Sequence, residues 1–246
     1  MRIVVVSPPR SGNHWVECLL STIYDLQHMA GKQKPAVITR KAIRAWVEAG
    51  GFPDQSITHM HRGFDCKFCD VIEAIPAHLV TVVRDPYDVF VSRYYWTQRP
   101  TLGNRSGNSR KAKRRPWQSM VGRSLDDPAV LAFLAAPKGF GSSIGSTNKW
   151  LHSGRAIAVR YEDLHDDPVA ALTRVTEQIA PVERERIEAA IEACRAENMR
   201  QQSAMMSWNV RVAKVGDSRE RLTEAHLAIF RQRYADQIRS LGFEVR

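Results

Sequence analysis

The sequence predicts an α/β domain in which a central, mainly parallel sheet is flanked by helices. A short, continuous run of β-branched residues at 3–6 is typical of a buried parallel strand. A turn containing Gly12 follows and leads into a helical pattern, which is the order of elements in α/β proteins. The chain has 246 residues, 43% of them hydrophobic, which is enough for one domain with a sizeable core. We therefore expect a single domain over residues 1–246.

The remaining elements continue this alternation. Further strands are expected at 56–60, 79–83 and 156–159, with a loop at 160–163. A helix should begin at Pro86, because proline suits the first turn of a helix. More helices are expected at 168–179, 183–196 and 220–241. The last of these has a single apolar face, made by Leu227, Phe230, Tyr234, Ile238 and Leu241.

The charge balance predicts an anionic partner. The chain has 36 Lys and Arg against 26 Asp and Glu, a net charge of +10. Such an excess suits nucleic acid, a phosphorylated cofactor, a polyanion or an acidic membrane. Residues 89–125 contain no acidic side chain, and 99–116 is also rich in Gly, Asn, Ser and Pro. We interpret 99–116 as a basic, mobile surface loop; a merely solvated face is the alternative.

The cysteines and apolar runs favour a reduced, cytoplasmic protein. Four cysteines are too few for a disulfide scaffold, and Cys66 and Cys69 lack a second pair that would complete a zinc site. We therefore expect no metal and assign these cysteines to packing. No run approaches the ~20 apolar residues of a transmembrane segment. The first apolar run is also too short for a signal peptide.

The first chemical motif is the segment from Ser7 to Trp15, SPPRSGNHW. A loop between a buried strand and a helix presents backbone N–H groups and the helix dipole to an anion. Arg10 adds a positive charge with bidentate geometry. A Walker A loop is excluded, because Asn13 and His14 replace its Lys and its metal-binding hydroxyl. The segment is either a phosphate loop without a magnesium ligand or an ordinary turn.

The second motif runs from Arg84 to Tyr94, RDPYDVFVSRY. Arg84 follows a predicted strand, at the edge where open α/β sheets bind ligands. Ser92 lies about two helical turns further on. A guanidinium and a hydroxyl together suit a second phosphate.

These two segments, in this order, resemble the sulfotransferase family that uses 3′-phosphoadenosine 5′-phosphosulfate (PAPS). Residues 9–15 are similar to the family's first motif, P-[KR]-S-G-T-T-W. Residues 84–94 match its second motif, R-[ND]-x-x-D-V-x-V-S-x-Y, at every fixed position. Weaker matches are YEDL at 161–164 and R-K-G-x-x-G-D at 211–217, where Val212 and Ala213 replace Lys and Gly. The resemblance spans residues 3 to 223 and implies a P-loop-like, three-layer domain of the cytosolic type. We expect a prokaryotic source.

The resemblance implies roles on the 5′ side of the donor. Arg10 stands where the family grips the 5′-phosphate and the bridging oxygen to sulfur, and Ser11 and Gly12 complete that loop. Asn13 and His14 stand where two Thr hydroxyls bind the same phosphate. Both replacements keep the backbone N–H groups but change the side-chain contacts.

The resemblance also implies roles on the nucleoside side. Trp15 matches the residue that stacks on adenine, with a core Trp as the alternative. Arg84, Ser92 and Arg211 match ligands of the 3′-phosphate. Tyr161 matches a contact to the adenine.

The family's catalytic base is often a His in a K-T-H segment after the second strand. Thr58-His59 matches that segment, and Ile57 replaces its Lys. Histidine suits the role because its usual pKa, near 6.5, allows proton transfer near neutrality. His61 is a competitor on the same strand face, and a structural role remains open for either histidine.

The sequence therefore predicts metal-independent, in-line transfer of a sulfuryl group from PAPS, with Arg10 and His59 as catalytic residues. The acceptor is expected to be a small molecule, lipid or glycan, an anionic one included. One rival is a P-loop kinase of a nucleotide or small molecule, which needs magnesium. The other is a non-catalytic polyanion or nucleic-acid binder, although we expect no nucleic-acid partner.

Overall fold

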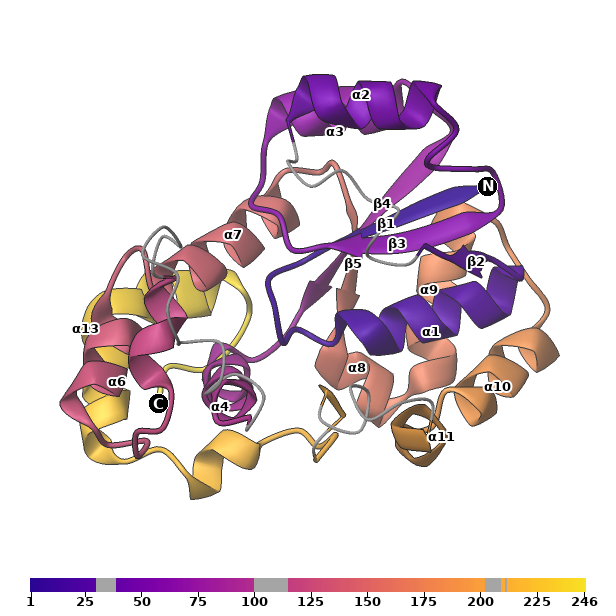
Figure 1. The fold of residues 1–246 in the computed structure, drawn as a ribbon. Helices are drawn as coiled ribbons and strands as arrows, with labels where there is room; N and C mark the ends of the chain where they lie inside the picture. The colour runs from indigo at the N-terminus through magenta and orange to yellow at the C-terminus, as the bar shows by residue number, and fades with distance from the viewer. Residues whose placement is uncertain (30–38, 100–114, 202–208, 211) are drawn as a thin grey trace.

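The computed structural model describes residues 1–29, 39–99, 115–201, 209–210 and 212–246 (Figure 1). Their five strands form one sheet with the order β2-β3-β1-β4-β5, and every pairing is parallel. The strands are β1 (Arg2–Val6), β2 (Gln27–His28), β3 (Ser56–Met60), β4 (Ala77–Val83) and β5 (Ile157–Arg160). β1 lies at the centre, with β3 and β4 as its neighbours. The predicted α/β, P-loop-like class is confirmed.

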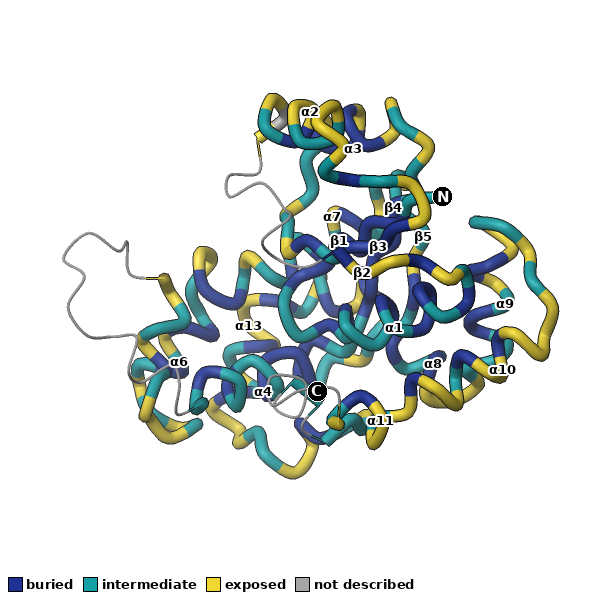
Figure 2. Tube along the Cα trace, turned by 45° about the vertical axis from the view of Figure 1, so that its right-hand side comes forward, coloured by how far each residue is buried: buried dark blue, intermediate teal, exposed yellow. Residues whose placement is uncertain are grey.

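Helices cover both faces of this sheet, so the domain has three layers (Figure 1). Ile3 and Val5 of β1 point to one face, where α1 (Asn13–Tyr24), α8 (Tyr161–Asp166), α9 (Pro168–Ile179) and α10 (Arg184–Ala193) pack. Val4 and Val6 point to the other face, which is covered by α2 (Arg40–Glu48), α3 (Cys66–Glu73) and a side chain of α7 (Gly141–His152). Because both faces are covered, β1, β3 and β4 are largely buried, as Figure 2 shows in dark blue, whereas both residues of the edge strand β2 are exposed.

A second core lies beyond the carboxyl end of β4. It is built from α4 (Pro86–Thr97), α6 (Pro128–Ala135), α7, α13 (Glu224–Ser240) and the 3₁₀-helix η3 (Pro116–Met120). Phe90, Phe140 and Phe230 pack edge to face at its centre. This core supports α4, whose first turn begins three residues after β4 ends.

The strand predictions are confirmed, and β2 is an addition that the sequence analysis missed. The helices expected after Gly12, from Pro86 and at 168–179 are also present. The predicted helix at 183–196 ends at Ala193, and α11 (Ala196–Gln201) follows it. The 220–241 prediction divides into η4 (Asp217–Glu220) and α13. Helices α2, α3, α6 and α7 were not predicted.

The predicted loop at 160–163 is wrong, because the chain forms α8 from Tyr161. Glu162 and Asp163 occupy the first turn, where acidic side chains favour the positive end of the helix. Tyr161 and Leu164 lie buried on its inner face.

The expectation of four reduced cysteines is also wrong for one pair. Cys18 of α1 and Cys194, which follows α10, form a disulfide across a sequence separation of 176 residues. Cys66 and Cys69 are free thiols. Among the described residues, no helix is long and apolar enough to cross a membrane. Most of the basic loop predicted at 99–116 lies outside the described residues, which do not include 100–114.

Candidate functional site

A cavity of about 800 Å³ opens at the carboxyl end of the sheet. This is a suitable size for a ligand such as a nucleotide with a small acceptor. Its lining comes from the loop after β1, the end of β3, α4, α8 and the segment from Cys194 to Asp217. The site is at this place because the chain connects β1 to neighbours on opposite sides, which leaves a crevice beside the end of β1.

Two buried hydroxyls fix the end of β1 to β4. Ser7 Oγ accepts a hydrogen bond from the Val82 backbone N–H at 2.6 Å. Thr81 Oγ1 donates to the Val6 carbonyl at 3.0 Å. Together they extend the attachment of the two strands into the loop, which therefore starts from a rigid base.

The loop from Ser7 to Gly12 leaves the N-terminus of α1 open. Arg10 and Gly12 have φ angles of 79° and 109°, in the left-handed region. Gly12 is the N-cap of α1, so no side chain caps the helix, and its first turn holds no acidic residue. Unpaired N–H groups and the helix dipole at such an end favour an anion.

The Tyr161 ring closes the space behind this loop. A Cβ added at Gly12 would lie 2.6 Å from Tyr161 Cδ2, so only glycine fits there. The Arg84 guanidinium lies 4.0 Å from the centre of the same ring. Trp15 meets the ring edge to face at a centroid distance of 5.5 Å and also contacts His165 at 4.9 Å.

The two sequence motifs meet through their basic side chains. Arg10 Nε donates to Ser92 Oγ at 3.0 Å, and its Nη2 donates to the Asn209 carbonyl at 2.8 Å. Arg84 donates to the carbonyls of Arg10 and Lys214, both at 3.3 Å. Arg84 Nε is buried without a hydrogen-bond partner in the described part of the chain. Arg211, the third predicted member, lies outside the described residues.

Asp88 is a site residue whose role the sequence analysis missed. This buried carboxylate accepts hydrogen bonds from the backbone N–H groups of Gly216 at 2.7 Å and Ser218 at 2.9 Å. It thereby attaches the C-terminal wall of the cavity to α4. The sequence did offer a signal for Asp88, because this residue is the fixed Asp of the second motif. Ala213, at a family Gly position, has a φ of 55°.

Asn13 and His14 make contacts that the family's two hydroxyls would not make. Asn13 Nδ2 lies 3.3 Å from the carbonyls of both Ser7 and Pro8 and stabilises the loop. His14 lies on the cavity wall, and its ring meets that of His59 at a centroid distance of 4.6 Å.

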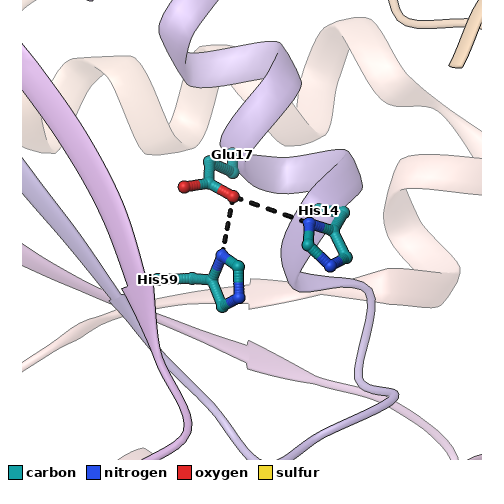
Figure 3. Close-up of side chains that lie close together, drawn as sticks. All are labelled: His14, Glu17 and His59. Carbon is teal, nitrogen blue, oxygen red and sulfur yellow. Dashed lines mark hydrogen bonds and ion pairs between the residues drawn. The ribbon is translucent and has the colours of Figure 1, made fainter. Parts of the chain in front are cut away.

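Glu17 is the other residue that the sequence analysis missed. Its carboxylate lies close to several histidine side chains, two of which are drawn in Figure 3. The His59 Nδ1–H donates to Glu17 Oε2 at 2.7 Å, and His14 Nδ1 lies 3.7 Å from the same oxygen. His28 Nδ1 is 3.8 Å from the other carboxylate oxygen. Burial alone would raise the pKa of Glu17, but the three histidines outweigh it and hold that pKa well below its usual range. The available signal in the sequence was an acidic residue three positions, about one helical turn, after His14.

The two candidate bases have different surroundings. His61 lies on the cavity wall, and His59 is not among the lining residues. His61 Nδ1 is 3.1 Å from the Ser7 carbonyl. Desolvation by the surrounding protein lowers the pKa of His61, although the residue is exposed to solvent. That shift makes His61 a weaker base than an ordinary imidazole.

A basic and aromatic wall forms the end of the cavity beyond Ser92. Arg93 lies over the Trp96 ring at 5.0 Å and has no hydrogen bond or ion pair with any described residue. Burial and the charge of Arg115 lower the pKa of Arg93 to about 10. Trp117 packs edge to face on Trp96 at 5.2 Å. The wall therefore holds a partly desolvated cation against the Trp96 ring, on whose edge or face Trp117 also packs.

The model of the sulfotransferase domain matches residues 1–242 of the chain. This protein belongs to the sulfotransferase domain family. Mouse sulfotransferase SULT7A1 complexed with PAP has a similar structure, with a TM-score of 0.70 and 17% identity over 97% of this chain and 84% of that chain. None of the curated proteins matches the sequence significantly.

Two further sulfotransferase-like structures are those of retinol dehydratase. One is a complex with androsterone and the inactive cofactor PAP, with a TM-score of 0.64. The other is a complex with retinol and PAP, with a TM-score of 0.62. Both have 14% identity over 100% of this chain and 82% of the other chain. At such identities the likeness shows the sulfotransferase fold.

The packing of Gly12 on Tyr161 gives a first prediction. The Gly12→Ala variant should lose both stability and nucleotide binding, because its Cβ meets a buried ring as well as an unfavourable φ. Gly50→Ala is the matched control, since Gly50 also has a positive φ, 73°, but no atom within 4 Å of an added Cβ. Thermal melts and nucleotide titrations compare them. Equal losses in both variants would show that the ring contact does not matter.

Proposed function

We propose that this protein is a PAPS-dependent sulfotransferase that transfers the sulfuryl group to a hydroxyl or amine acceptor. The observation that carries the proposal is the meeting of both anion-binding motifs in one cavity, where Arg10 Nε reaches Ser92 Oγ at 3.0 Å. Two anion sites this close suit one ligand with phosphates at both its 3′ and 5′ positions.

Each part of the donor has a proposed place. The open N-terminus of α1 and Arg10 would hold the 5′-phosphosulfate. Arg84 and Ser92 would hold the 3′-phosphate, and Arg84 Nε has no hydrogen-bond partner among the described residues. Trp15 and Tyr161 would enclose the adenine, because their rings line the cavity next to Arg84.

The C-terminal wall is the part of the proposed donor site that differs most from the family's motif. Arg211 stays a proposed ligand of the 3′-phosphate. Lys214 lies on the cavity wall, where its ammonium pairs with Glu220 at 3.0 Å, and we propose that it serves in place of the family's missing Lys. Similar structures contain PAP, which supports the choice of donor.

The proposed reaction is an in-line displacement at sulfur. His59 accepts the acceptor's proton at Nε2, since Glu17 holds the proton on Nδ1. The acceptor oxygen or nitrogen bonds to sulfur as the bond from sulfur to the bridging oxygen breaks. The electron pair remains on the 5′-phosphate, where Arg10 stabilises the growing charge. No step in this scheme requires a metal ion.

The rival functions have weaker support. A P-loop kinase would need a lysine and a hydroxyl where Asn13 and His14 stand, and both side chains already have partners inside the protein. The basic segment that would favour a nucleic-acid binder falls largely outside the described residues. The cytoplasm stays the proposed location, although the Cys18–Cys194 disulfide argues against it, because cytosolic disulfides are rare.

We further propose that the acceptor is a small molecule, lipid or glycan that carries an anionic group and an apolar or ring-shaped body. Arg93 supports the anionic group, because a desolvated guanidinium without a carboxylate partner in the described residues gains from a bound anion. Trp96 and Trp117 would pack on the body.

Donor selectivity is the direct test of the proposed function. PAP, the 3′,5′-bisphosphate product, should raise the melting temperature, with about 2.7 kcal/mol of stabilisation at 100 times its dissociation constant. ATP should stabilise the protein poorly, because it has no 3′-phosphate for Arg84 and Ser92. Differential scanning fluorimetry with equal ligand concentrations, with and without magnesium, measures both. An equal shift for the two nucleotides would contradict the proposal.

Arg84→Ala should weaken donor binding more than it slows turnover at saturation. The 3′-phosphate is remote from sulfur, so its contact contributes equally to the ground and transition states. A charged hydrogen bond is worth about 1.5–3 kcal/mol, which predicts a roughly 10- to 150-fold rise in the dissociation constant of PAP. Arg174→Ala, an exposed arginine paired with Asp163, is the control. Unchanged PAP affinity in a folded Arg84→Ala protein would remove Arg84 from the site.

The base is tested by three variants. His59→Ala should lower kcat by about 10²- to 10⁴-fold without changing PAP affinity. Glu17→Gln should lower kcat less, because it removes only the charge that orients His59. His61→Ala should have the smallest effect. A larger loss of kcat for His61→Ala than for His59→Ala would reverse the assignment.

Arg93→Gln should raise the Michaelis constant for an anionic acceptor about 10-fold or more, while a neutral acceptor is unaffected. Arg123→Gln is the control, because that exposed arginine pairs with Asp127 away from the cavity. Steady-state kinetics with matched acid and methyl-ester acceptors separate the two cases. Equal changes for both acceptors would show that Arg93 does not recognise charge.

A further inference from the structure

We propose that His14, Glu17 and His59 form a binding site for a divalent transition-metal ion such as Zn²⁺, and that the ion switches off the proposed catalytic base. One ring nitrogen of each histidine and one oxygen of Glu17 lie within 4.8 Å of one another (Figure 3). Two imidazoles and one carboxylate are a ligand set that zinc uses in proteins where a fourth position stays open. Imidazole ligands favour zinc and its transition-metal neighbours over Mg²⁺ or Ca²⁺.

The distances fit this assignment. A tetrahedral ion with ligand bonds of roughly 2.0–2.2 Å places its ligand atoms about 3.3–3.6 Å apart. Glu17 Oε2 lies 2.7 Å from His59 Nδ1 and 3.7 Å from His14 Nδ1. An ion therefore replaces one hydrogen bond with only small side-chain movements. His14 and Glu17 are fixed relative to each other, because they are three residues apart on α1.

Burial and charge also favour an ion. The Glu17 side chain is only 6% exposed, and those of His14 and His59 are 31% and 20% exposed. The cationic groups that the described structure pairs with this carboxylate are histidines alone, so among the described residues its charge is balanced by a protonated imidazole or by a bound cation. A divalent ion supplies that charge and leaves the imidazoles neutral. His14 also lies on the cavity wall, which gives the ion an entry path.

The consequence for catalysis follows from the atoms involved. A metal on His59 Nδ1 takes the lone pair of that nitrogen, so the single ring proton of neutral His59 moves to Nε2. Nε2 then cannot accept the acceptor's proton. This second part of the proposal depends on the proposed function, whereas the binding site does not.

Cobalt absorbance tests the site without any assay of activity. The tag-free, chelator-treated protein should bind one Co²⁺ per chain, with visible d–d bands and no thiolate charge-transfer band, and Zn²⁺ should displace it. His14→Ala, Glu17→Gln and His59→Ala should each weaken binding at least about 100-fold, since even loss of an outer contact costs 10- to 100-fold. His14 is a partly exposed residue of the first turn of α1, so its variant should fold if the buried Glu17→Gln does not.

Two control variants make the result specific. His152→Ala removes a histidine that bonds Ser240 at the surface, and Cys66→Ser removes an exposed thiol of the CxxC pair. Neither should change Co²⁺ affinity. Absence of binding, or binding that is lost in Cys66→Ser and kept in His14→Ala, would overturn the site. If Zn²⁺ binds at this site and turnover is unchanged, the inhibitory role is wrong. If the protein does not transfer a sulfuryl group at all, the proposed function is wrong, but the cobalt result still stands.

Discussion

The candidate site depends on the close approach of Gly12 to the ring of Tyr161, which leaves no room for a Cβ. This contact allows the loop after β1 to lie directly against α8, so that α1 begins beside the carboxyl ends of β4 and β5. The Arg84 guanidinium lies over the same ring, 4.0 Å from its centre. One aromatic side chain thus sets the spacing between the open helix N-terminus and the arginine of the second motif, and that spacing decides which ligand fits both.

Most of the fold could be predicted because its signals are local. β1 and β4 carry continuous β-branched runs, IVVV and VTVV, which are typical of buried parallel strands. Both chemical motifs are also local, and each follows a strand, so their meeting at one sheet edge follows from parallel pairing. The two-residue strand β2 is too short to leave a pattern. Tyr161 was expected in a loop, since its α8 has only six residues and is stabilised by packing.

The missed features connect residues that are far apart in sequence. Glu17 and His59 are 42 positions apart on α1 and β3, and their hydrogen bond exists only because β3 lies next to β1. Cys18 and Cys194 meet through the packing of α1 on α10, which no spacing rule reveals. Asp88 was visible as a fixed motif position, but its partners at 216 and 218 were not. Sequence patterns indicate which residues are candidates for binding or catalysis, whereas tertiary packing decides which of them lie close enough to act together.

The most direct test of the central claim is a PAPS-dependent acceptor screen read by mass spectrometry. With ³⁴S-labelled PAPS and a library that includes carboxylated, phosphorylated and neutral alcohols and amines, a product should carry the labelled sulfuryl group as an equal amount of PAP is released. The product should need no added magnesium, and it should disappear with Arg10→Ala. Phosphoryl transfer from ATP that needs magnesium, with no labelled product from PAPS, would contradict this account.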